Sequence, residues 1–177
     1  MNRLYRISYE FPVESWGDSQ VEIALQYWQM LGFQCSQTTA LGIEAKRGNL
    51  LGNYFSFNMT KLICRLSVAA SPQCIITSKL EVDGAGQIIT EWNLASFKIE
   101  HLLFRRKLRN LPPSISLEQF MKANRRASLA WTISLGLRGA KLPQHWKNVI
   151  HALGDETTPP VAEIILRPSV ENGATAI

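Results

Sequence analysis

Cysteine and histidine are scarce in this sequence of 177 residues, which holds three of each. Cys35, Cys64 and Cys74 show neither the Cys-x-x-Cys spacing of zinc and redox sites nor a histidine close by in the sequence. Their odd number gives no disulfide framework, so we interpret them as small core residues of a protein in a reducing compartment. The sequence therefore predicts no metal and no cofactor.

We expect neither a membrane-spanning segment nor a signal peptide in this sequence. Residues 23–43 carry no charge, but four Gln, a Ser and two Thr make this stretch too polar to cross a bilayer. The first eleven residues resemble a strand rather than a charged segment followed by an apolar one. These observations predict a cytoplasmic protein.

No catalytic motif is complete. The sequence has no Gly-x-Ser-x-Gly, and Glu100-His101 lacks the second histidine of a zinc-binding His-Glu-x-x-His helix. The glycine-containing loop at residues 48–53 lacks the Lys-Ser/Thr of a phosphate-binding loop. We assign no catalytic residue, and an enzyme ranks last among the functions considered.

Alternating polar and apolar residues predict the strands of one antiparallel sheet. Residues 3–11 alternate over their whole length, and Pro12 closes the segment. Shorter segments of the same character follow at residues 33–39, 41–47, 61–68 and 74–82. Residues 161–166 either add an edge strand or stay loosely packed.

Such a sheet has one dry face and one wet face. We expect Ile63 and Leu80 to be largely buried on the dry face. Glu44 and Glu81 are interpreted as residues of the solvent face, because ionisable residues seldom lie in a core.

Helical spacing of apolar residues appears in four segments. The first follows Asp18 and ends at Gly32. Residues 91–109 are apolar on two sides, which is typical of a helix wedged between two layers or docked to a partner. Ser116 and Gln119 form a capping-box pattern that opens a helix over about residues 117–135. Pro143 opens a shorter helix that Gly154 ends.

The fold class predicted from these elements is α+β, with about four to five antiparallel strands packed by helices. Residues 1–154 are interpreted as one domain, with a sheet-and-helix body at 1–110 and appended helices at 111–154. Residues 155–177 are interpreted as a linker-like or loosely packed tail. The order of one strand, one helix, three to five strands, a long helix and extra helices resembles the helix-grip architecture of START-like ligand-binding domains and TATA-binding-protein-like folds. This resemblance is one of element order, and it implies fold more than function.

The positive charge is concentrated in one region. Residues 98–147 carry eleven Lys and Arg against two Glu, whereas residues 1–97 carry seven basic and eight acidic residues. Such asymmetry indicates an anionic partner. The predicted contact residues are Arg105, Arg106, Lys107, Arg109, Lys122, Arg125 and Arg126.

Three hypotheses follow. In the first, a non-catalytic binding or assembly protein uses this basic region to contact an acidic protein or another anionic partner. In the second, a helix-grip carrier holds a small apolar ligand. In the third, the region binds nucleic acid without sequence specificity or an anionic membrane surface. An apolar groove or partner contact is expected at Trp92, Phe97, His101 and Phe104.

Overall fold

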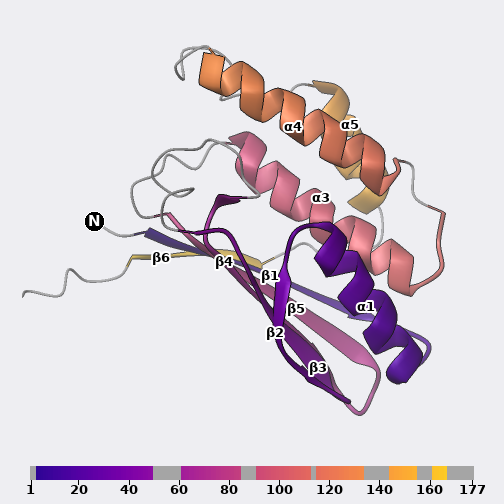
Figure 1. Cartoon of the computed structure of the whole chain (residues 1–177). Helices are drawn as coiled ribbons and strands as arrows, with labels where there is room; N and C mark the ends of the chain where they lie inside the picture. Colours follow the sequence, from indigo (N-terminus) through magenta and orange to yellow (C-terminus); the bar gives the residue numbers. More distant parts are fainter. Residues whose placement is uncertain are drawn as a thin grey trace, which may run out of the picture.

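The computed structural model describes residues 3–49, 61–84, 91–112, 115–133, 144–154 and 161–166. It shows an α+β fold in which a six-stranded antiparallel sheet carries helices on one face (Figure 1). The strands are β1 (Arg3–Pro12), β2 (Gln34–Thr39), β3 (Gly42–Arg47), β4 (Cys64–Ala70), β5 (Ile75–Asp83) and β6 (Val161–Leu166). The helices are α1 (Asp18–Met30), α3 (Glu91–Leu108), α4 (Leu117–Ile133) and α5 (Gln144–Gly154). The predicted fold class and element order are confirmed.

The strand order in the sheet is β2-β3-β4-β5-β1-β6. β1 therefore lies between β5 and β6. Residues 161–166, for which the sequence allowed either an edge strand or a loosely packed segment, form the edge strand β6. This strand raises the number from the predicted four to five to six. The rest of the predicted tail, like most of the loop at 48–53, lies outside the described residues.

One face of the sheet is the core and the other is polar. Leu80 is fully buried, as predicted, and Glu44 and Glu81 lie on the solvent side, also as predicted. The prediction for Ile63 is wrong, because it is only half-buried. Its two neighbours are buried instead: Leu62, which precedes β4, and Cys64, the first residue of β4.

α3 is wedged between two layers, which is one of the two alternatives that its two apolar sides predicted. Figure 1 shows α1 and α3 on the sheet, with α4 and α5 on the outer side of α3. Toward the sheet, Phe104 packs edge-on against Phe11 of β1. Toward the outer layer, Trp92 packs edge-on against Trp146 of α5. Burial on two sides explains why α3 lacks a single polar face.

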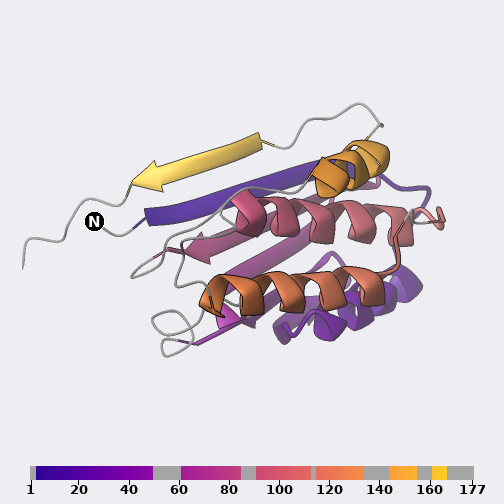
Figure 2. The same cartoon turned by 90° about the horizontal axis from the view of Figure 1, so that it is seen from above.

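Local signals fix where the helices begin and end. The predicted capping box is present: the Gln119 amide donates to Ser116 Oγ at 3.1 Å, and the Ser116 amide donates to Gln119 Oε1 at 3.0 Å. Gly32 ends α1 with φ +85°, a conformation that side chains with a Cβ disfavour. α4 then runs antiparallel to α3, as seen from above in Figure 2.

Candidate functional site

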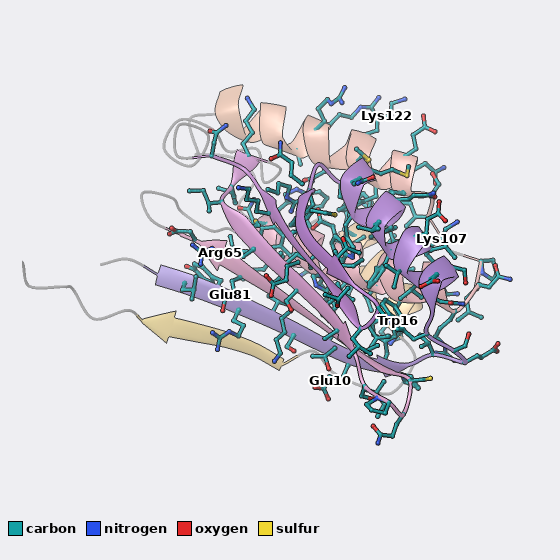
Figure 3. The ribbon with its side chains drawn as sticks, turned by 60° about the horizontal axis from the view of Figure 1, so that its bottom comes forward. Glu10, Trp16, Arg65, Glu81, Lys107 and Lys122 are labelled. Carbon is teal, nitrogen blue, oxygen red and sulfur yellow. The ribbon has the colours of Figure 1, made fainter. Side chains whose placement is uncertain are left out.

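The basic residues of α3 and α4 lie on the outer, helical side of the molecule. Lys107 and Arg109 are exposed at the C-terminal end of α3, and Lys122, Arg125 and Arg126 are exposed in the first half of α4. The antiparallel arrangement brings both groups toward the end of the molecule where the two helices connect (Figure 2). Lys107 and Lys122 are labelled on this side in Figure 3.

Arg106 lies in the same region and has a structural contact. It is half-buried, and its Nε and Nη2 donate to the carbonyl of Pro112 at 3.2 and 3.0 Å. This bond satisfies a carbonyl in the connection between α3 and α4. Arg106 therefore adds charge to the surface while holding the turn.

Arg105 differs from its basic neighbours. The expectation that its guanidinium lies at the surface is wrong, because the residue is 6% exposed and its Nη2 donates to the Leu153 carbonyl at 3.0 Å. It lies on the side of α3 that α5 covers. We therefore use the term basic helical surface for the six remaining residues: Arg106, Lys107, Arg109, Lys122, Arg125 and Arg126.

Four of these cations have no ionic partner among the described residues: Lys107, Lys122, Arg125 and Arg126. Glu118 is the one acidic residue in the sequence of α4. Lys122 and Arg126 are four residues apart and so share one helical face. Their charges are consequently not balanced within the described part of the chain.

A pocket of about 210 Å³ adjoins this surface between the end of α1 and α4. Met30 on its rim is 61% exposed, the highest value but one among the exposed large apolar residues of the described chain. Arg125 belongs to both the pocket and the basic helical surface. The other residues that line the pocket are Leu31, Gly32, Glu100, Phe120, Met121 and Asn124.

The four residues predicted to form an apolar groove lie in the core instead. Phe97, His101 and Phe104 are fully buried, and Trp92 is nearly so. Trp92 donates from Nε1 to Asn124 Oδ1 at 3.0 Å, which fixes α4 on α3. The groove prediction fails because the outer layer and the sheet cover both apolar sides of α3.

A buried ion pair, which the sequence did not predict, lies beneath the helices. Arg47 Nη1 and Nη2 donate to Glu100 Oε1 and Oε2 at 2.9 and 3.1 Å, and both side chains are at most 1% exposed. Arg47 also donates to the Leu31 carbonyl at 3.0 Å and lies 4.3 Å from the centre of the Phe33 ring. This one guanidinium thus links the end of α1, β3 and α3.

Burial shifts the protonation equilibria of the groups around this pair. It raises the pKa of Glu100, and the Arg47 guanidinium opposes that rise. It also lowers the pKa of His101 to about 4. His101 Nδ1 lies 2.9 Å from the Phe97 carbonyl, which fixes a neutral ring donating from Nδ1, and the ring stacks on Tyr9. The neutral imidazole is therefore a structural group at ordinary pH.

The cysteines are less uniform than predicted. Cys64 is fully buried, and burial raises its pKa to about 11. Cys35 and Cys74 are half-buried free thiols. Among the described residues, no group of three or more His, Cys, Asp or Glu side chains is placed to hold a metal ion. No helix in the described ranges is long and apolar enough to cross a membrane.

No protein-family model, curated protein or solved structure matches this chain. Its candidate site is accordingly defined by geometry and charge alone.

Proposed function

We propose that this protein is a non-catalytic binding or assembly protein whose basic helical surface contacts an acidic protein. The observation that carries the proposal is the set of exposed cations on α3 and α4 that have no ionic partner in the described ranges: Lys107, Lys122, Arg125 and Arg126. Isolated surface charges contribute little to folding. When such charges face an acidic surface on a partner, they speed association and fix the relative orientation of the two proteins.

The composition of the surface favours carboxylates as the groups recognised. Guanidinium groups donate in a fork that matches a carboxylate. Four of the six residues of the basic helical surface are arginines: Arg106, Arg109, Arg125 and Arg126. The neighbouring pocket offers an apolar anchor point beside Arg125, since Met30 and Met121 lie in its lining. An acidic segment with one apolar side chain fits both features.

The two other hypotheses have less support. Space between the sheet and α3 is filled by packed rings, including Tyr9 on His101 and Phe11 on Phe104, where an apolar ligand would have to lie. The described part of the basic helical surface carries no aromatic side chain on which bases could stack. Binding to nucleic acid or membrane therefore becomes an alternative outcome of the test.

The test compares charge reversals on the two sides of the molecule. Lys122→Glu/Arg126→Glu changes the helical side, and Lys46→Glu/Lys79→Glu makes the same change in net charge on the sheet. Each protein is used to capture binding partners from a cell extract at low and high salt, and captured proteins are quantified by mass spectrometry. Heparin and anionic vesicles are tested in parallel.

We expect acidic proteins to be captured by the unaltered protein and by the sheet variant, and to be lost with the helix variant or at high salt. Equal capture by all three proteins would overturn the proposal. Retention on heparin or vesicles without capture of any acidic protein would replace it with the nucleic-acid or membrane hypothesis. Circular dichroism confirms that each variant is folded.

A further inference from the structure

The face of the sheet opposite the helices holds a pocket of about 370 Å³. No described helix lies over this face, which is turned toward the viewer in Figure 3. The pocket is lined by side chains of β3, β4 and β5 on the solvent side: Glu44, Lys46, Arg65, Ser67, Lys79 and Glu81. It is separate from the basic helical surface.

The strand register places these charges in a defined row. Lys46 is directly opposite Arg65, Arg65 is opposite Glu81, and Glu81 is opposite Arg6. Figure 3 shows Arg65 and Glu81 near each other on this face. In the next row, Ser67 lies between Glu44 and Lys79.

Glu81 does not neutralise Arg65, although the two residues are opposite. Arg6 holds Glu81 from its other side, with Nε and Nη2 donating to the same oxygen at 3.1 and 2.7 Å. The side chains of Lys46, Arg65 and Lys79 form no hydrogen bond or ion pair with the described residues. Three cations around one pocket thus have no paired carboxylate among the described residues, although Glu44 and Glu81 also line the pocket.

This arrangement is unfavourable in the absence of an anion. Like charges directly opposite each other on neighbouring strands destabilise a sheet. Ser67 has the smallest of the six polar side chains that line the pocket, and its hydroxyl can donate a hydrogen bond to an anion there. An anion over Ser67 would relieve the repulsion between Lys46 and Arg65 and would contact Lys79.

We propose that this pocket binds the phosphate group of a small, soluble phosphate monoester. A phosphate carries more charge than a carboxylate and offers three acceptor oxygens, which suits three cations that line one pocket. A volume of about 370 Å³ also leaves room for the organic part of the ligand. Glu44 and Glu81 lie at the wall, so that part carries hydroxyl or amino groups.

A lipid headgroup fits this pocket less well than a soluble ligand. The exposed large apolar residues of the described chain are Met30, Leu41, Ile75 and Leu94, and none of them lines the pocket. The two apolar lining residues, Ala45 and Leu66, are buried on the core face. Lipid chains would consequently meet charged side chains.

The test follows backbone amide resonances of the ¹⁵N-labelled protein during titration with inorganic phosphate and with phosphoethanolamine. Chloride at matched ionic strength controls for screening, and phosphatidylcholine vesicles containing phosphatidic acid test the lipid source. We expect saturable shifts at Arg65, Ser67 and Lys79 with both phosphates, larger affinity for phosphoethanolamine, and no such shifts with chloride or vesicles.

Two variants address the site directly. Arg65→Gln removes a charge-assisted hydrogen bond and should weaken binding about tenfold. Ser67→Asp places a carboxylate between Glu44 and Lys79, so it should abolish phosphate binding by repelling the anion. Lys122→Glu/Arg126→Glu should bind phosphate as the unaltered protein does.

Equal responses to chloride and phosphate would overturn the proposal, as would unchanged affinity in Arg65→Gln. A response to vesicles without a response to either soluble phosphate would also overturn it. Because the probe is phosphate and the variants lie on the sheet, this outcome is independent of whether the basic helical surface binds an acidic protein.

Discussion

Arg47 of β3 and Glu100 of α3 form a bidentate ion pair in the core, with N–O distances of 2.9 and 3.1 Å. The pair joins the sheet to the helix whose C-terminal end carries part of the basic helical surface. A second pair of the same chemistry, Arg6 with Glu81, lies on the sheet surface with side chains 37% and 29% exposed. The molecule thus provides a buried and a surface Arg–Glu pair for direct comparison.

Removing one partner should affect the two pairs very differently. Glu100→Gln leaves Arg47 buried without a counterion, and we expect the free energy of unfolding to fall by about 3–5 kcal/mol. Glu81→Gln should lower it by at most about 1 kcal/mol, because solvent screens the exposed pair. Urea unfolding at neutral pH measures both values.

The double substitution Arg47→Met/Glu100→Leu is the matched control for the buried pair. It removes both charges and should recover most of the stability lost in Glu100→Gln. Equal losses in Glu100→Gln and Glu81→Gln would contradict the structural role assigned to the buried pair.

His101 should make the stability of the protein depend on pH in the acid range. Burial lowers its folded pKa to about 4, below the ordinary value of 6.5. The unfolded chain therefore binds a proton that the folded chain does not, and stability falls as pH drops from about 6.5 to about 4. The lost contribution is about 3 kcal/mol.

This effect is measured as the difference between the unaltered protein and His101→Gln, which cancels the titration of the carboxyl groups common to both. Urea unfolding is followed at several pH values between 4 and 7. If the two proteins lose stability in parallel over this range, His101 is not the group responsible.

Arg105 and Lys107 are two residues apart in α3, but we expect them to contribute unequally to the stability of the protein. Arg105 is buried and bonded to the Leu153 carbonyl, so Arg105→Met should cost about 1–3 kcal/mol. Lys107 is exposed and unpaired in the described chain, and Lys107→Met should change stability by less than about 0.5 kcal/mol. Similar thermal unfolding curves for the two variants would place Arg105 at the surface after all.

The thiols should react with a disulfide reagent in two classes. Cys64 is fully buried with its pKa raised to about 11, whereas Cys35 and Cys74 are half-buried. In the folded protein the reagent should modify Cys35 and Cys74 first, and Cys64 only after unfolding in urea. Peptide mass spectrometry identifies the modified residues; early modification of Cys64 would contradict its placement in the core.

The sequence predicted most accurately those elements whose formation depends on residues close together in the chain. Period-two alternation predicted the strands, and the Ser116–Gln119 pair predicted the start of α4. The two apolar sides of α3 predicted either a layered position or a partner. Choosing between these alternatives needed the positions of α4 and α5, which depend on contacts between distant parts of the chain.

The candidate site was predicted less completely for the same reason. Sequence spacing does not reveal that α5 covers Arg105 but leaves Lys107 exposed. The burial of Arg47 could have been predicted from the sequence. In β3, alternation from Ile43 through Ala45 continues to Arg47, which puts this arginine on the core face. A charged residue in that position requires a buried partner, and Glu100 supplies it.

The role proposed for the basic helical surface is tested most directly by the rate at which a captured acidic protein associates with the unaltered chain. The association rate constant is compared between the unaltered protein, Lys122→Glu/Arg126→Glu and Lys46→Glu/Lys79→Glu at two ionic strengths. We expect a decrease of about tenfold in this rate constant for the helix variant at low salt, with little change for the sheet variant. An unchanged rate constant in the helix variant, or an equal decrease in the sheet variant, would contradict the proposal that the basic helical surface is the binding site.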